Sequence, residues 1–146
     1  MSVLKVIRSW RDLPVKQLEQ LCQDSRDVEY LRLEFFRVEG AICCLWIDQD
    51  RCVSLARLEP WRDGFLLTGL ETAVDRRKCG YASSLLMEIC AYLKTQGAVR
   101  VYSHIGKGNT ASIRTHEACG FCKTSDMAAY VDGSVDGKAC TYTCNL

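Results

Sequence analysis

The sequence predicts an α+β (mixed α/β) fold in which a mostly antiparallel sheet is flanked by helices. Residues 35–48, 51–61 and 64–74 are three apolar-rich stretches separated by short polar turns, the pattern of an antiparallel meander. Residues 81–96 then place apolar side chains at helical spacing, and residues 98–105 return to the alternation of a strand. Strands and helices therefore mix along one chain.

The elements before the meander are less regular. Residues 3–9 are expected to form a first strand, and residues 13–22 carry an approximate helical stripe of apolar side chains. The pattern of residues 23–34 is ambiguous between a loop and a second short helix. We therefore expect at least one helix between the first strand and the meander.

The elements after the meander have clear boundaries. The helix over residues 81–96 repeats its apolar side chains at i, i+3 and i+4, and Gly97 ends it. A second helix is expected to begin at Asn109, a favoured N-cap residue, and to end at Gly120. Short strands with a glycine-rich turn between the last two are expected at residues 121–124, 128–131 and 138–144.

Composition excludes several classes of protein. At 146 residues, with 48% hydrophobic and 25% charged residues, the chain is expected to be one folded domain over residues 1–146. The net charge of +1 and the absence of a basic run argue against a nucleic-acid partner. The longest apolar stretch, residues 41–47, is too short to cross a bilayer, so no membrane partner is expected. Charges at Lys5, Arg8 and Arg11 interrupt any signal peptide, and we expect a cytoplasmic location.

The chain contains ten cysteines. In a reducing compartment their default state is the free thiol, packed as a small hydrophobic side chain. Two close pairs, Cys119 with Cys122 and Cys140 with Cys144, leave open a four-thiolate zinc site or a redox dithiol. The first pair follows a predicted helix instead of preceding one, and no His lies near either pair, so we expect no metal.

The segment with the clearest chemistry joins the third strand of the meander to the helix at residues 81–96. A helix start offers unpaired N–H groups to an anion, and Gly80 has no Cβ that would block a phosphate. Arg76, Arg77 and Lys78 add positive charge at the rim. The P-loop and Rossmann glycine patterns are both missing. The loop therefore predicts a phosphate or pyrophosphate site of another kind.

Two segments resemble the GNAT superfamily of N-acetyltransferases. The stretch Arg77-Lys78-Cys79-Gly80-Tyr81-Ala82 resembles the superfamily's acyl-CoA loop, [Q/R]-x-x-G-x-[G/A]. The segment from Asn109 through Ser112 and His116 to Gly120-Phe121 is similar to its N-x-x-[A/S]-x-x-x-Y-x-x-x-G-F helix and turn. The likeness is close from Phe65 to about Phe121, and the earlier elements match in order only.

The resemblance implies a GNAT fold, in which the fourth and fifth strands splay apart around the pantetheine arm of acetyl-CoA. It implies direct transfer of the acetyl group to a primary amine, without a metal. Acetyl-CoA and an amine acceptor are thus the expected partners. The residues that it assigns to the cofactor are Glu71, Thr72 and Ala73 through their backbone, Arg77, Lys78, Cys79, Gly80, Tyr81 and Ala82 around the pyrophosphate, and Asn109 and Ser112 on the second helix.

The same resemblance assigns the expected catalytic residues. His116 stands where the superfamily often has a Tyr whose hydroxyl faces the departing sulfur, so it is expected to be a general acid or to stabilise the thiolate. His104 stands where some relatives have a catalytic Glu and is the expected base, with Glu71 as its rival. On the acceptor side, Glu59, Trp61 and Glu71 are candidate lining residues.

Three readings of the function stay open. An N-acetyltransferase is the first, an acyl-CoA sensor with little turnover the second, and a thiol-rich redox or zinc protein the third. The identity of the amine, whether small molecule or protein, is not encoded in any motif. The sequence also leaves open whether the chain forms a homodimer.

Overall fold

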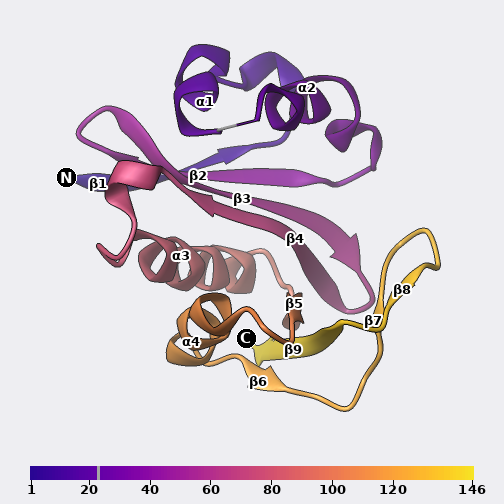
Figure 1. Ribbon diagram of the computed structural model, residues 1–146. Helices are drawn as coiled ribbons and strands as arrows, with labels where there is room; N and C mark the ends of the chain where they lie inside the picture. The colour runs from indigo at the N-terminus through magenta and orange to yellow at the C-terminus, as the bar shows by residue number, and fades with distance from the viewer. Residues whose placement is uncertain (23) are drawn as a thin grey trace.

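The computed structural model describes residues 1–22 and 24–146 and consists of one large sheet covered by helices on both faces (Figure 1). The seven strands of the sheet run in the order β1-β2-β3-β4-β5-β9-β6. Among the strands that the structure describes, only the β4–β5 pairing is parallel. This confirms the expected α+β class with a mostly antiparallel sheet.

The first third of the chain supplies one edge strand and one helical layer. Its elements are β1 (Ser2–Ile7), η1 (Trp10–Asp12), α1 (Val15–Leu21), α2 (Ser25–Leu33) and η2 (Phe35–Arg37). The ambiguous segment therefore contains a helix, and Asp24 caps it by accepting a hydrogen bond from the Arg26 N–H at 2.9 Å. Gln23, the first residue of that segment, lies outside the described residues.

The three central strands form the expected meander with two boundaries in error, since the first strand begins later than expected and the third ends at Thr72 instead of residue 74. They are β2 (Ile42–Asp48), β3 (Arg51–Trp61) and β4 (Gly64–Thr72). The strand expected over 35–48 begins only at residue 42, because Phe35 is fully buried in a 3-10 turn and packs edge-on against Phe36. Gly40 then takes a positive φ of 81° and turns the chain into β2.

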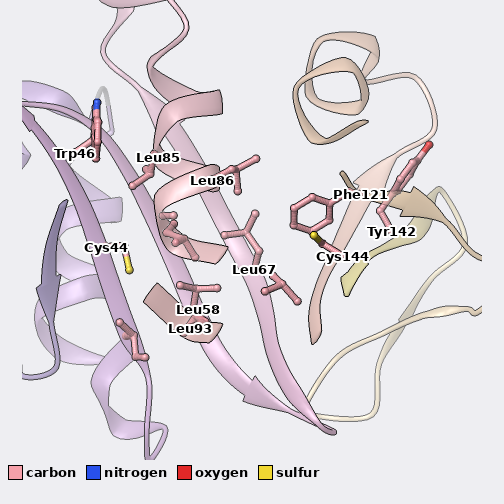
Figure 2. Close-up of a cluster of buried hydrophobic side chains, with 14 of the residues drawn as sticks. Cys44, Trp46, Leu58, Leu67, Leu85, Leu86, Leu93, Phe121, Tyr142 and Cys144 are labelled. Carbon is pink, nitrogen blue, oxygen red and sulfur yellow. The ribbon is translucent and has the colours of Figure 1, made fainter. Parts of the chain in front are cut away.

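Both faces of the sheet are covered, which explains why β2 reads as a continuous apolar run. Cys44 and Trp46 point to the face covered by α3 (Tyr81–Thr95) and belong to the same apolar cluster as Leu85 and Leu86 (Figure 2). Cys43 and Leu45 point to the other face, beneath α1 and α2. The cysteines in these layers pack as small apolar side chains, and all ten are free thiols.

β4 and β5 (Arg100–Gly106) separate partway along their length. Their pairing runs only from Gly64 opposite Arg100 to Leu67 opposite Ser103. Thr68 is the extra residue of a bulge against β3, since Arg57 pairs with Gly69 and the next residue, Leu58, with Leu67. From Thr68 to Thr72 β4 has no partner on its β5 side, so the expected splay is present.

The second half of the chain closes the sheet beside β5. Its elements are η3 (Val74–Arg76) before α3 and, after β5, α4 (Thr110–Ala118), β6 (Cys122–Lys123), β7 (Ala128–Ala129), β8 (Val135–Asp136) and β9 (Ala139–Asn145). The glycine-rich stretch expected as a plain turn contains β8, which pairs with β7 as a separate hairpin. Among the described residues, the helices are all too short or too polar to span a membrane.

Candidate functional site

A groove of about 680 Å³ opens where β4 leaves β5, within the size range of small-molecule sites. Its walls are the free end of β4, the loop before α3, the first turn of α3 and the exposed side of α4. The residues that line it are Leu70, Glu71, Thr72, Arg76, Arg77, Lys78, Gly80, Tyr81, Ala82, Ser83, Asn109, Ala111, Ser112 and Thr115. The two segments singled out in the sequence thus face each other across one groove.

The free edge of β4 offers backbone groups to this groove. The Ala73 N–H donates to the Val53 carbonyl on β3 at 2.9 Å. Because backbone groups alternate between the two sides of a strand, those of Glu71 also face β3, and those of Leu70 and Thr72 face the groove. The Thr72 carbonyl already accepts a hydrogen bond from Arg77 Nε at 3.3 Å. The Leu70 groups and the Thr72 N–H therefore remain for a ligand.

The start of α3 has the geometry of an anion site. Gly80 occupies the N-cap position with φ 83°, and no side chain caps the helix there. The first intrahelical bond runs from the Ser84 N–H to the Gly80 carbonyl, so the three preceding N–H groups stay unpaired. A Cβ on Gly80 would meet no atom within 4 Å and would project into the open space that an anion needs. The helix dipole adds favourable potential at this end.

Two polar anchors hold this loop against the β2–β3 turn. The Tyr81 hydroxyl donates to Asp48 at 2.7 Å, and with a second bond from Ser2 this lowers the pKa of the Asp48 carboxyl. Arg51 forms a bidentate pair with Asp75 at 2.7 and 2.8 Å, just before the loop. Of these residues, Asp48, Arg51 and Asp75 carry no motif, and the sequence pattern did not predict them.

The second predicted segment lies on the opposite wall. The Asn109 side chain accepts from the Ser112 N–H at 3.2 Å and begins α4, as its N-cap pattern predicts. The next turn adds Ala111, Ser112 and Thr115 to the groove. The predicted cofactor residues found in the groove are therefore Glu71, Thr72, Arg77, Lys78, Gly80, Tyr81, Ala82, Asn109 and Ser112.

Two of the predicted cofactor residues do not line the groove. Ala73 is 2% exposed, packs beneath the α1–α2 layer and uses its N–H on β3, so it is not free to pair with a pantetheine amide. Cys79 is exposed on the loop, and its Sγ lies 3.5 Å from the Arg77 carbonyl. The position of Ala73 follows from the alternation of backbone groups between the two sides of a strand. The sequence did not show which of these sides would pair with β3.

His116 was expected to share the cofactor-facing side of α4, but it lies on the inner side of the helix. The ring is 1% exposed, and its Nδ1 donates to the Ser112 carbonyl at 2.7 Å. That bond leaves Nε2 as the acceptor for the Ser103 hydroxyl at 3.0 Å. The ring also packs edge-on against Phe121 at 5.0 Å between centroids.

Burial lowers the pKa of His116 and favours the neutral ring. The ring connects α4 to β5 and is not among the groove-lining side chains. Its Nδ1 also lies 3.3 Å from the hydroxyl of Ser112, which lines the groove. Its predicted role as a general acid remains a prediction.

His104 lies beyond the paired part of β4 and β5, at the β7–β8 hairpin. Its Nε2 donates to the Ala129 carbonyl at 2.8 Å, and its Nδ1 is 3.1 Å from the Thr141 hydroxyl. The ring packs edge-on against Tyr130, and burial lowers its pKa. The two histidines and Glu71 are therefore not brought together, and the role of His104 as a base remains a prediction too.

A second cavity of about 190 Å³ lies under α1 and α2 and shares Leu70 and Glu71 with the groove. Its other lining residues are Cys22, Asp27, Leu31, Leu55, Arg57 and Gly69. Burial and the nearby charge of Glu71 raise the pKa of Cys22 to about 12, which keeps this thiol protonated. Of the three expected acceptor-side residues, Glu71 lines this cavity and Glu59 and Trp61 do not.

The cysteine pairs give no support to a metal centre. Cys119 and Cys144 lie close together, with the Cys144 Sγ 3.9 Å from the Cys119 carbonyl. Across the two described ranges, however, no group of three or more Cys, His, Asp or Glu side chains is arranged to hold a metal ion. The exposed Cys122 sits on the short edge strand β6.

Solved structures with this fold include several acetyltransferases. The IAA acetyltransferase from Bacillus cereus ATCC 14579 superposes with a TM-score of 0.74 at 14% identity, over 100% of both chains. The ribosomal-protein-S18-alanine N-acetyltransferase from Escherichia coli gives 0.70 at 16%, over 99% of this chain and 94% of the other. A GNAT family acetyltransferase from Elizabethkingia anophelis, solved with acetyl-CoA bound, gives 0.73 at 13%, over 99% and 98%.

Comparison of the sequence identifies the family of the chain, which the structural likenesses at 13–16% identity do not. The comparison with curated protein sequences found no match. The sequence model of one family, described as "Acetyltransferase (GNAT) family", matches residues 7–121. This match covers most of the chain and includes β4, the loop before α3 and the whole of α4. The chain therefore belongs to the GNAT acetyltransferase family.

Proposed function

We propose that this chain is an N-acetyltransferase that moves the acetyl group of acetyl-CoA directly to a primary amine. The observation that supports this most strongly is the single groove shared by the unpaired edge of β4 and the uncapped start of α3. Acetyl-CoA carries both an extended arm with amides and a pyrophosphate. The groove offers a complementary surface to each.

In this proposal the pyrophosphate lies at the start of α3. The unpaired N–H groups after Gly80 would donate to its oxygens, and Arg77 and Lys78 would balance its charge. The pantetheine arm would lie along β4 as an added strand, paired with the Leu70 backbone groups and the Thr72 N–H. Asn109 and Ser112 would contact the arm from the α4 side.

The acceptor would enter from the opposite face. The smaller cavity under α1 and α2 meets the groove at Leu70 and Glu71, so an amine held there lies next to the same stretch of β4. Glu71 is the carboxylate common to both cavities among the described residues, and we assign it the role of base. His104 and His116 have both ring nitrogens engaged elsewhere.

The reaction balances without a metal or an oxidant. Glu71, directly or through water, takes a proton from the ammonium form of the acceptor, because only the neutral amine is nucleophilic. The amine nitrogen attacks the thioester carbonyl carbon, the C–N bond forms and the C–S bond breaks. The CoA thiolate leaves and takes up a proton, and the second amine proton is lost as the amide forms.

The deciding experiment measures acetyl-CoA binding by calorimetry and then product formation with a mixture of amines. Free CoA should be quantified by chromatography, because Cys79 and Cys122 are exposed thiols that would react with a colorimetric thiol reagent. We expect binding together with amine-dependent release of CoA. Binding without release would favour the acyl-CoA sensor, and no binding at all would refute the proposal.

A further inference from the structure

Arg57 is a charged residue within an apolar strand. It lies on β3 between the fully buried Ala56 and Leu58, and its side chain lines the cavity under α1 and α2. Its guanidinium lies over the Tyr30 ring of α2, 5.2 Å from the centroid. A cation placed so close to a core is unfavourable unless it has a partner.

The contacts of Arg57 within the chain are few. Its Nε is buried and has no hydrogen-bond partner among residues 1–22 and 24–146. Nη2 reaches only the Thr68 carbonyl, at a long 3.4 Å. In the same described ranges, every carboxylate is farther than 4.0 Å from the guanidinium nitrogens. The donors are thus oriented without an acceptor that balances their charge.

The strand opposite makes room for this guanidinium. Gly69 pairs with Arg57, and a Cβ at Gly69 would lie 2.5 Å from Nη2 and 2.6 Å from Nε. Gly69 does not take a positive φ, so its backbone does not require glycine. The missing side chain therefore serves the position of Arg57, which holds the guanidinium over β4 and beside the cavity.

The cavity presents charges of both signs at different places. Asp27 of α2 and Glu71 of β4 supply carboxylates, and Arg57 supplies the cation. Leu31 and Leu55 add apolar side chains to the lining. The volume of about 190 Å³ equals about six water molecules at liquid density. A small zwitterion with one apolar side chain fits this pattern of charge and size.

We propose that the acceptor is a free α-amino acid with a small side chain, whose carboxylate is bound by Arg57 and whose amine lies beside Glu71. This inference rests on the proposed N-acetyltransferase function. A guanidinium matches a carboxylate with two parallel N–H donors, and its two Nη nitrogens form such a pair. A diamine would place its second ammonium against Arg57 and is disfavoured by charge.

The experiment compares three forms of one acceptor: L-valine, L-valinamide and isobutylamine, with spermidine as a polyamine probe. Acetylated product and free CoA are measured by chromatography at saturating acetyl-CoA. The kcat/KM for valine should exceed that for valinamide by at least about 10²-fold, because a site with an unpaired guanidinium rejects an analogue that cannot pair with it. Amine basicity cannot produce this preference. The amine of valinamide is less basic than that of valine, so a larger fraction of it is neutral and nucleophilic at neutral pH.

Two variants test the residue. In Arg57→Met the ratio of kcat/KM for valine to that for valinamide should fall toward one, with the loss mainly in KM. Gly69→Ala keeps the charge but displaces the guanidinium, and it should reduce the same ratio by about 10-fold or more. Arg37→Met is the matched control, since Arg37 is 75% exposed, pairs with Glu34 and lies outside both cavities.

Calorimetric binding of valine to the complex with CoA gives a readout that does not depend on turnover. Valine should bind to the wild-type complex and bind at least about 10-fold more weakly to the Arg57→Met complex. If acetyl-CoA binds and spermidine or isobutylamine is acetylated as well as valine, the amino-acid inference is wrong and the transferase proposal survives. If acetyl-CoA binds and no member of the panel is acetylated, the amino-acid inference is wrong, and CoA release with the mixture of other amines decides between the transferase and the acyl-CoA sensor. If acetyl-CoA itself does not bind, the proposed function fails.

Discussion

Replacement of His116 by alanine separates a structural role from a catalytic one. The substitution removes a ring that is 1% exposed, its packing against Phe121, and the hydrogen bonds to the Ser103 hydroxyl and the Ser112 carbonyl. Truncation of a large buried side chain costs about 2–3 kcal/mol, and the lost hydrogen bonds add about 1 kcal/mol. We expect the free energy of unfolding to fall by about 3–4 kcal/mol.

The assay is thermal and urea unfolding, followed by kinetics well below the transition. For a chain of this size the loss should lower Tm by roughly 10–15 °C. Because the ring does not line the groove, kcat should change by less than about threefold, whereas loss of a general acid would lower it by about 10²-fold. Ser103→Ala is a control that removes one hydrogen bond and leaves the ring in place. A kcat reduced by about 10²-fold with little loss of stability would refute the structural role.

The pH dependence of stability provides an independent check on the same residue. Burial lowers the pKa of His116 in the folded state from 6.5, so the unfolded chain binds a proton more readily. Stability should therefore be fully present above pH 6.5 and decrease as the pH falls below that value. His104, whose pKa burial also lowers, contributes in the same direction. In His116→Ala the decrease between pH 7 and 5.5 should be shallower, and an unchanged slope would contradict this origin.

The remaining predictions concern the groove and the thiols. Gly80→Val should abolish measurable acetyl-CoA binding in calorimetry, since valine is strained at φ 83° and its side chain would fill the anion space; wild-type affinity would disprove the loop assignment. Arg77→Ala should weaken the same binding by about 10-fold, and no change would place the pyrophosphate elsewhere. Cys79 is exposed between Lys78 and Gly80, which both line the groove, so bound acetyl-CoA should slow its labelling by maleimide, as peptide mass mapping would detect. Cys22, whose pKa burial raises to about 12, should stay unlabelled with or without cofactor; rapid labelling would contradict its burial.

The cofactor side of the site was predictable because its signals are local. A glycine at the N-cap of a helix, basic neighbours and an Asn that begins the next helix are all read within a few residues. Gly80 and Asn109 therefore lie on the groove as expected. The helical period over residues 81–95 likewise predicted the buried face of α3, because residues three or four apart in the sequence lie on the same side of a helix.

The direction in which individual side chains face was decided by tertiary structure. His116 lies one position after Thr115 on α4, and a rotation of about 100° per residue separates the groove from the core. Whether Ala73 would bond to a ligand or to β3 depended on the pairing of a strand far away in sequence. Both the side of α4 that faces the groove and the partner of the Ala73 N–H are determined only when the helices pack against the sheet.

The acceptor side combines both kinds of information. A charged Arg57 in an apolar strand and a Gly69 in the next strand are visible in the sequence, but neither has meaning alone. Their pairing across the bulge, the Tyr30 ring above and the two carboxylates nearby come from three separate elements. Local sequence thus determined the fold class and the loop that we propose binds phosphate, because short-range geometry specifies both. Only the tertiary structure decided which charges share a cavity, since their proximity results from long-range packing.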